Sequence, residues 1–251
     1  MRFSKLISIV MIFFFIISSA CRAEIKTITF GVDATYPPFE FLAPDGSVQG
    51  FEVEIVKKLC KQINAQCKFV NLPFDSLIPS LKLGKVDAAF SCISYNDERA
   101  QQVKYVKPYM YIDTVSFIAL KNQGDLTDDN LIKTKIIAIE GGTIYKDYLQ
   151  KKYGDSIKIK TYEDAQQEFM DLIAGRVDIV MGDTPFISQW LKNQANQDNY
   201  QINVIHDPAF ENGSYLIVRK DNAELAKTLS SAIQAAINNG VIPAIVKPYL
   251  K

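Results

Sequence analysis

Short apolar runs alternate along the chain with longer stretches whose apolar residues recur at helical spacing. The short runs predict strands, and the longer stretches predict helices that bury one face. The predicted strands cover 28–32, 67–70, 86–91, 135–139, 157–161 and 177–181, and the predicted helices cover 51–63, 74–83, 144–152, 164–174, 184–193 and 223–238. Strand and helix in turn are typical of an α/β fold with largely parallel sheets.

One phrase occurs twice in this pattern. Residues 81–91 read LKLGKVDAAFS, and residues 172–182 read LIAGRVDIVMG. In each copy a glycine, Gly84 or Gly175, stands where a helix C-terminus needs a residue that tolerates a positive φ, and a buried strand follows. Two such units, each in a β-α-β-α-β order, predict two lobes of similar build.

The polar residues that follow each copy, 91–94 and 182–184, stand at the carboxyl ends of strands. Ligands of open α/β sheets bind at these ends, so two facing lobes would bring both sets into one cleft. The segments 109–120 and 211–218 predict two extended hinge strands between the lobes. We expect a discontinuous lobe 1 (24–111 and 208–251) and a lobe 2 (112–207).

Residues 1–23 predict a secretory signal peptide. Arg2 and Lys5 precede the apolar run 6–17, and small residues follow it. The run is shorter than the roughly 20 residues that a bilayer requires, so we expect export to the periplasm. Cleavage after Ala20 would leave Cys21 at the new N-terminus for a lipid anchor, whereas cleavage after Ala23 would remove it.

Charge and rare residues exclude several classes of function. The chain has 28 basic and 28 acidic residues, and removal of 1–23 takes away three basic ones, which leaves a net charge of −3. This balance does not favour nucleic acid as a partner. One histidine and scattered cysteines offer no metal-ligand spacing, so neither a metal nor a cofactor is predicted. In an exported chain Cys60 and Cys67 are plausible disulfide partners, the alternative being two buried thiols, and Cys92 is then the unpaired thiol.

Four motifs together resemble one family. GVDATYPPFE at 31–40, GxxxGFEVE at 46–54, FDSLIPSL at 74–81 and SxxSxxDER at 91–99 are similar to the periplasmic binding proteins of polar amino-acid ABC importers, most of all to the arginine and lysine/arginine/ornithine binders. The resemblance implies a two-lobed type II fold, a monomer that closes over a free amino acid, and an inner-membrane ABC permease as partner. Cys60 and Cys67 also fall where related binders have a disulfide.

The resemblance assigns the two poles of the amino acid to opposite lobes. The planar guanidinium of Arg99 can bind a carboxylate through two parallel bonds. Backbone N–H groups of Ser94 and Thr143 would assist, since Thr143 follows two glycines and opens a helix. Asp183 fits the α-ammonium, with Ser91 as a further acceptor, although Asp183 could instead cap the following helix.

The ligand's side chain is expected between aromatic faces. Tyr36 and Phe74 resemble the two rings that sandwich the ligand in relatives, and Asp33 the acid that meets its distal group, which suits a cation. We also take Tyr36 to lie in a loop, because Pro37-Pro38 follows it. Cys92, Ile139 and Gly142 complete the expected ligand-binding set. Cys92, Gly142 and Ile144 depart from the polar residues usual at these positions, which leaves the particular amino acid open.

These observations predict a binding protein for a cationic L-amino acid, arginine first, without catalytic residues. Lysine, ornithine, histidine and glutamine remain alternative ligands. A cyclohexadienyl-dehydratase-like enzyme on the same fold is a second hypothesis, although Asp33 and Asp183 would repel the second carboxylate of its substrate. A sensor that reports its closed form to a membrane kinase is a third.

Overall fold

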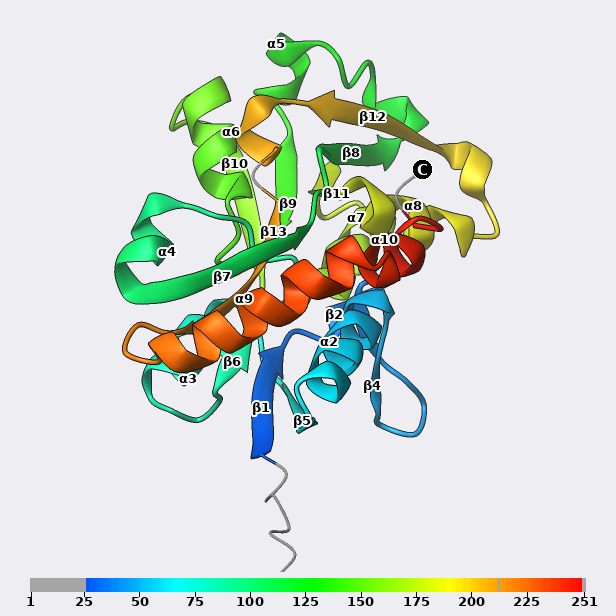
Figure 1. The fold of residues 1–251 in the computed structure, drawn as a ribbon. Coiled ribbons are helices and arrows are strands. Elements are labelled where there is room, and N and C mark those ends of the chain that lie inside the picture. The colour runs from blue at the N-terminus through cyan, green and yellow to red at the C-terminus, as the bar shows by residue number, and fades with distance from the viewer. Residues whose placement is uncertain (1–25, 212, 250–251) are drawn as a thin grey trace, which may run out of the picture.

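Two five-stranded sheets form the two lobes in the computed structural model, which describes residues 26–211 and 213–249 (Figure 1). The first sheet has the order β5 (Ala65–Asn71), β1 (Lys26–Val32), β6 (Ala88–Ala89), β13 (Ser214–Arg219) and β7 (Val103–Met110). The second has the order β10 (Lys158–Tyr162), β9 (Ile136–Glu140), β11 (Ile179–Asp183), β8 (Thr114–Leu120) and β12 (Tyr200–His206). The signal peptide predicted at 1–23 and the lipid anchor at Cys21 lie outside the described residues.

Both sheets are mostly parallel, as the sequence predicts. In the first sheet β1 pairs in parallel with β5 and β6, and β13 is antiparallel to both β6 and β7. In the second sheet β9 pairs in parallel with β10 and β11, and β8 is antiparallel to both β11 and β12. Each sheet thus has one reversed strand, and the carboxyl ends of the remaining strands share one edge.

Helices cover both faces of each sheet. They are α2 (Phe51–Gln62), α3 (Leu77–Lys82), α4 (Asp97–Gln102), α5 (Asp129–Ile132), α6 (Tyr145–Tyr153), α7 (Ala165–Ile173), α8 (Thr184–Lys192), α9 (Ala223–Asn238) and α10 (Val241–Val246). Helices α2, α9 and α10 share one apolar core with the first sheet, and α3 covers its other face. Helices α7 and α8 cover one face of the second sheet and α6 the other.

The repeated phrase has the same structure in both lobes. Gly84 and Gly175 follow α3 and α7 with φ of 69° and 67°, as expected for a residue that ends a helix. The aspartates of the phrase also have matching roles: Asp87 Oδ2 accepts from Thr29 N, and Asp178 Oδ2 accepts from Ile136 N, each at 2.8 Å. The repeated Val-Asp therefore attaches each helix–strand unit to its neighbouring strand, so its polar group serves the fold.

The chain passes between the sheets twice. The first crossing, residues 111–113, joins β7 to β8, so the predicted segment 109–120 contains parts of two strands. The second crossing joins β12 to β13 and contains a 3-10 turn at Pro208–Phe210 in place of a continuous strand. A small three-stranded sheet of β2 (Thr35–Tyr36), β3 (Glu40–Leu42) and β4 (Val48–Gln49) is absent from the prediction, because strands this short have no readable periodicity.

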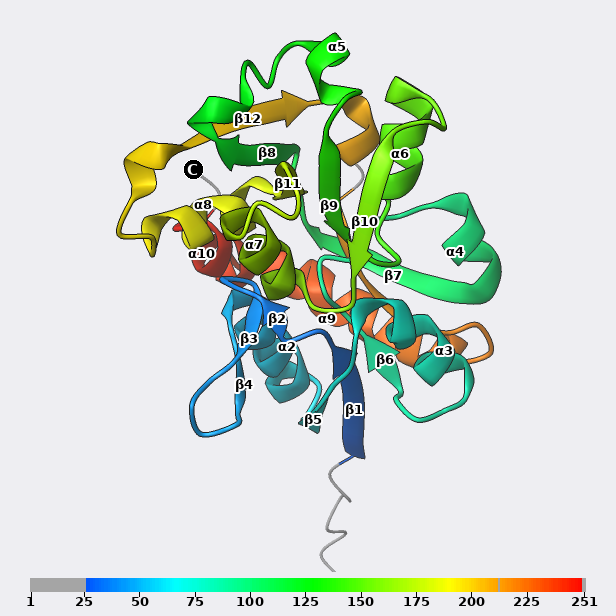
Figure 2. The same ribbon diagram turned by 180° about the vertical axis from the view of Figure 1, so that it is seen from behind.

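This small sheet lies against α7 of the other lobe (Figure 2). The Tyr36 ring stacks on Phe186 of α8 with 3.9 Å between ring centroids, and Gln166 Nε2 of α7 donates to Thr35 O at 2.7 Å. Tyr36 is 6% exposed and belongs to a short strand, so the expectation that the diproline keeps it in a loop outside the core is wrong. A prolyl residue restricts the backbone before it to extended angles, and these also suit a strand.

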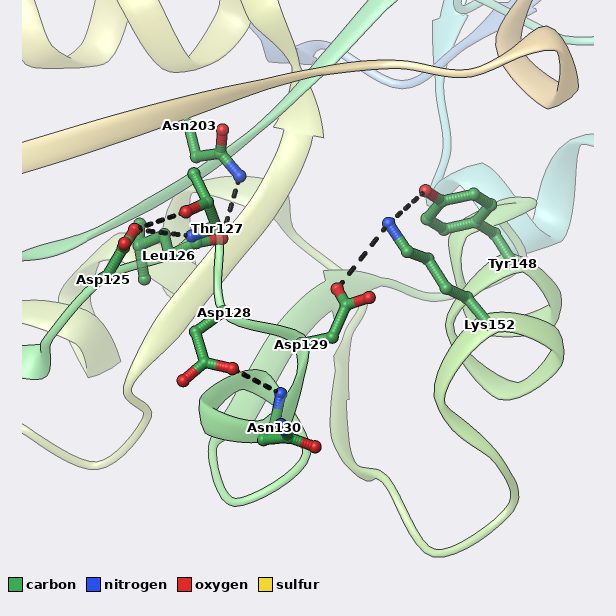
Figure 3. A network of polar contacts seen from close by, with 9 residues as sticks. All are labelled: Asp125, Leu126, Thr127, Asp128, Asp129, Asn130, Tyr148, Lys152 and Asn203. Carbon is green, nitrogen blue, oxygen red and sulfur yellow. Dashed lines mark hydrogen bonds and ion pairs between the residues drawn. The ribbon is translucent and has the colours of Figure 1, made fainter.

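Two local features stabilise regions outside the cleft. Cys60 and Cys67 form a disulfide that joins the end of α2 to β5. Figure 3 shows the loop before α5, where Asp125 Oδ1 accepts from the Thr127 backbone and hydroxyl and Asn203 donates to Leu126 O. Among the described residues, no helix is both long and apolar enough to traverse a lipid bilayer.

Candidate functional site: the interlobe cavity

A cavity between the lobes opens at the carboxyl ends of the strands of both sheets. Lobe 1 contributes residues of β2 and β3 and of the segments that follow β5 and β6, and lobe 2 contributes residues from the ends of β9 and β11 and from the start of α6. The lining residues are Tyr36, Glu40, Phe74, Ser91, Cys92, Ser94, Arg99, Glu140, Thr143, Ile144, Tyr145 and Asp183. The two polar segments that follow the repeated phrase therefore meet at one cavity, which is where parallel α/β sheets bind ligands.

Arg99 is a buried cation on this cavity. Its side chain is 7% exposed, Nη1 donates to Ser94 O at 2.8 Å, and Nη2 donates across the cleft to Gly142 O at 2.6 Å. The guanidinium also lies 5.4 Å from the centroid of the Phe74 ring. No aspartate or glutamate of residues 26–211 and 213–249 forms an ion pair with it. Burial lowers the pKa of Arg99, and a buried cation without a counterion calls for an anionic partner.

Asp183 lies on the opposite side of the cavity. It is the N-cap residue of α8, yet its side chain makes no capping hydrogen bond, so the carboxyl group faces other partners. Its backbone N–H donates to Tyr36 Oη at 2.9 Å. Burial raises the pKa of Asp183 to about 7, while hydrogen bonds from Tyr145 and Tyr36 act in the opposite direction. Asp183 can thus become an anion once a cation reaches it.

A pair of buried acids lies beneath the cavity in lobe 1. Ser91 Oγ donates to Glu40 Oε1 at 2.6 Å, and Tyr109 Oη donates to Glu52 Oε1 at 2.5 Å. The Cys92 backbone N–H donates to Glu52 as well. Glu40, Glu52 and Cys92 have potential metal-ligand atoms within 4.8 Å of one another, a proximity that the sequence does not predict.

The protonation state and the hydrogen bonds of Glu40 and Glu52 explain how two acids can be buried close together. Burial raises the pKa of Glu40, Glu52 and the Cys92 thiol, and the proximity of Glu52 raises the pKa of Glu40 further. Glu40 Oε2 has no hydrogen-bond partner in the structure, so a proton on Glu40 that Glu52 accepts would satisfy both groups. Cys92 is the free thiol of the described chain, as expected, and its raised pKa makes it a poor nucleophile at neutral pH.

Lobe 2 adds two buried acids with unpartnered oxygens, and one of them, Glu140, lines the cavity. Glu140 is 6% exposed and Glu168 is 1% exposed, and Oε1 of each has no hydrogen-bond partner. Asp33 of lobe 1 is 2% exposed, and its Oδ2 is likewise unpartnered, although Oδ1 accepts from Thr35 N and Oγ1. Burial is the main cause that raises the pKa of Asp33 to about 6 and the pKa of Glu140 and Glu168 well above their usual range.

Most of the predicted ligand-binding residues line the cavity, and three do not. Tyr36, Phe74, Ser91, Cys92, Ser94, Arg99, Thr143 and Asp183 line it. Ile139 and Gly142 line a neighbouring groove, which also includes Arg99 and Thr143, and Asp33 lines neither the cavity nor this groove. The side chains of Ile137 and Ile139 pack on the α6 side of β9, so alternation directs Glu140 to the α7 side.

Four lining residues were not in the predicted ligand-binding set: Glu40, Glu140, Ile144 and Tyr145. From the sequence, Ile144 is only a departure from a usual polar residue. Glu140 follows a predicted strand and precedes Gly141-Gly142, which is the same strand-end signal that identified Asp183. Glu40 belongs to the GVDATYPPFE motif but received no role. Tyr145 has no signal of its own, because an aromatic residue in the first turn of an amphipathic helix usually packs in the core.

Two lobes that enclose a polar cavity between the carboxyl ends of their strands define a type II binding protein. Residues 28–251 match the family described as bacterial extracellular solute-binding proteins, family 3, and the chain belongs to this family.

Relatives and solved structures agree with this assignment. The chain is 38% identical over 220 residues to the ABC transporter arginine-binding protein 1 of Escherichia coli K12, which covers 88% of this chain and 89% of the relative. A solved Salmonella typhimurium periplasmic binding protein, described for its high arginine specificity, is 31% identical with a TM-score of 0.83 over 90% of this chain and 100% of the other. An ancestral amino-acid-binding protein described as a precursor of cyclohexadienyl dehydratase shares the fold at 23% identity, with a TM-score of 0.76 over 90% and 95% of the two chains.

Proposed function

We propose that the protein captures a cationic L-amino acid, with L-arginine as the first candidate, and delivers it to an ABC permease of the inner membrane. One observation supports this most directly. Buried Arg99, which has no ion pair with an acid of the described residues, lines the same cavity as the acids Glu40, Glu140 and Asp183, and none of these acids has a cationic side-chain partner there. An amino acid offers both missing charges at fixed spacing, so its binding would satisfy both sets.

The two poles of the ligand would lie between the lobes. Arg99 would bind the α-carboxylate, assisted by backbone N–H groups of Ser94 and Thr143, and Asp183 would bind the α-ammonium, assisted by Ser91. Arg99 belongs to lobe 1 and Asp183 to lobe 2, so one zwitterion in contact with both would favour the closed arrangement. This effect of the ligand on closure requires that each lobe moves as a unit. We assign lobe 1 to residues 24–111 and 208–251 and lobe 2 to residues 112–207.

The distal part of the ligand would extend between Tyr36 and Phe74 toward the buried acids. An aromatic face attracts a guanidinium or ammonium by about 0.5–2 kcal/mol, and the acids add the stronger term. Cys92, Ile139, Gly142 and Asp33 complete the proposed surroundings of the ligand. The names of the Escherichia coli and Salmonella relatives support arginine over lysine, ornithine, histidine and glutamine.

We further propose export with removal of residues 1–23, a location in the periplasm and action as a monomer. An enzyme of the cyclohexadienyl dehydratase type fits the site less well. The substrate of such an enzyme has two carboxylates. Arg99 would bind one of them, while Asp33, Glu140 and Asp183 would repel the second.

A thermal-shift screen of the twenty amino acids, with ornithine and citrulline added, tests the proposal. We expect arginine to raise the melting temperature most. The stabilisation is large enough to measure, since a ligand at 100 times its Kd stabilises the folded state by about 2.7 kcal/mol. Absence of a shift with arginine, lysine, ornithine, histidine and glutamine would refute the proposed function. Formation of phenylpyruvate from prephenate would support the enzyme instead.

A further inference from the structure

Three side chains at the floor of the interlobe cavity come together from distant parts of the sequence. Glu40 belongs to β3, Glu52 to the first turn of α2, and Cys92 to the loop after β6. Two carboxylate oxygens and one thiol sulfur of these residues lie within 4.8 Å of one another. All three residues belong to lobe 1, so the cluster forms within one lobe and needs no contact from the other.

The cluster is buried and yet reaches the cavity. Glu40 and Glu52 are both 0% exposed, and Cys92 is partly buried. Glu40 and Cys92 line the cavity, whereas Glu52 does not. An ion held by the three side chains would therefore have one side open to the cavity.

One carboxylate oxygen of the cluster has no partner. Ser91 Oγ donates to Glu40 Oε1, while Glu40 Oε2 is buried without a hydrogen-bond partner. No lysine or arginine of residues 26–211 and 213–249 forms an ion pair with Glu40 or Glu52. A buried and unpartnered carboxylate oxygen beside a second acid requires a proton or a cation.

Neighbouring groups hold the second acid in place. Tyr109 Oη and the Cys92 backbone N–H both donate to Glu52. Hydrogen bonds of this kind orient the carboxylates of metal sites.

The ligand types favour zinc. Carboxylate oxygen and thiolate sulfur are both ligands of Zn²⁺, which takes four ligands and in open sites leaves one position to water. Mg²⁺ and Ca²⁺ take oxygen ligands, so the thiol of Cys92 distinguishes this cluster from a site for either of them.

We propose that Glu40, Glu52 and Cys92 bind one divalent cation of the Zn²⁺ class, with the fourth coordination position open to the cavity. The site goes beyond the proposed function and does not depend on it. Binding exchanges protons for the metal. The S–H bond of Cys92 and the O–H bond of a protonated carboxyl group break as their bonds to the metal form, and the protons pass to the solvent.

Cadmium reports the thiolate directly, because Cd²⁺ bound to sulfur has a charge-transfer absorption in the ultraviolet that Cd²⁺ bound to carboxylates lacks. The protein, freed of metal with a chelator and kept free of amino acids, would be titrated with Cd²⁺ in absorbance measurements and with Zn²⁺ in isothermal titration calorimetry. The variants are Cys92→Ser and Glu52→Gln. Glu54→Gln is the matched control, because Glu54 is exposed and lies on the same helix.

We expect the wild type to bind Zn²⁺ and to develop the Cd²⁺ absorption, and Cys92→Ser to lose this absorption. Loss of a residue that only orients a metal ligand costs about 10-fold to 100-fold in affinity, so loss of a ligand in Cys92→Ser or Glu52→Gln should weaken Zn²⁺ binding by about 100-fold or more. Glu54→Gln should match the wild type within about twofold.

Absence of the Cd²⁺ absorption in the wild type, or an equal absorption in Cys92→Ser, would overturn the metal site. This variant keeps every other thiol of the chain, so an absorption that persists in it arises elsewhere. A Zn²⁺ affinity that changes by less than about threefold in both variants would overturn the site as well. Thermal unfolding without metal confirms that each variant is folded, and Cys92→Ser keeps the test decisive where Glu52→Gln does not fold. None of these results depends on arginine binding, so a failure here leaves the proposed function intact.

Discussion

Replacement of Arg99 by alanine is the most direct perturbation of the proposed ligand site. Arg99 is 7% exposed and donates to Ser94 O within its lobe and to Gly142 O across the cleft. Alanine removes the guanidinium, its contact with the Phe74 ring and the interlobe hydrogen bond. It leaves the α-carboxylate of a bound amino acid buried without a cationic partner.

The size of the effect follows from that burial. Loss of one partner of a buried, hydrogen-bonded charge pair costs about 2–5 kcal/mol, and each 1.4 kcal/mol is a tenfold change in Kd. Arg99→Ala should therefore weaken arginine binding by about 30-fold to 3,000-fold. Arg99→Lys keeps the charge but loses the planar fork with its two parallel bonds, so its loss should be about tenfold.

Isothermal titration calorimetry on the purified, folded variants measures both changes. Arg176→Ala is the matched control: it removes an arginine from the second copy of the repeated phrase, where the side chain is 58% exposed and pairs with Asp171. Its Kd should stay within twofold of the wild type. An Arg99→Ala variant that melts near the wild-type temperature and binds arginine within threefold of the wild-type Kd would refute the carboxylate role of Arg99.

Three further predictions test other parts of the structure. Because burial raises the folded-state pKa of Asp33 to about 6 and that of Asp183 to about 7, the folded state without ligand binds more protons than the unfolded state between pH 4 and 7. Its unfolding free energy should fall as pH rises through this window, while arginine affinity should rise because the cation needs both carboxylates ionised. An unfolding free energy that rises with pH in denaturation, or an affinity that falls with pH in titration, would contradict this linkage. Replacement of both Cys60 and Cys67 by alanine opens a disulfide with a sequence separation of 7 and should lower the unfolding free energy by about 2–3 kcal/mol in urea denaturation, with arginine affinity unchanged. Gly142→Ala should weaken binding and closure in titration and scattering, since φ is +76° and a Cβ there would lie 3.0 Å from Asp75 Cβ of the other lobe; wild-type affinity would show that the lobes need not approach this closely.

Elements with strong periodicity were predictable from the sequence. Helix α9 has the predicted bounds, Ala223–Asn238, because a 16-residue amphipathic stretch leaves little ambiguity. The repeated phrase predicted the positive φ of Gly84 and Gly175, since local backbone geometry there depends on the glycine itself. The strand predicted at 86–91 is only Ala88–Ala89, because strand length depends on how far the neighbouring strands remain paired.

The site was predictable where a strand end and a motif coincided. Asp183 and Ser91 follow buried strands and line the cavity. Glu140 satisfies the same rule, but an acid before two glycines also suits an exposed turn, and a linear sequence does not show which side chains the second lobe will bury. Ile139 and Glu140 differ by one position, and strand alternation sends them to opposite faces of β9.

The charges around the cavity indicate why a cationic amino acid is the simplest ligand that leaves no buried charge unmatched. In the proposed site Arg99 would bind the α-carboxylate and Asp183 the α-ammonium, and any amino acid supplies both groups. Unpartnered oxygens then still remain on acids of both lobes, namely Asp33 and Glu40 of lobe 1 and Glu140 and Glu168 of lobe 2. A primary ammonium has three donors in a tetrahedral arrangement, whereas a guanidinium has five in one plane and can address acceptors on opposite sides at once. The planar cation therefore fits a site whose acceptors come from two separate lobes, and this geometry favours arginine over lysine or ornithine.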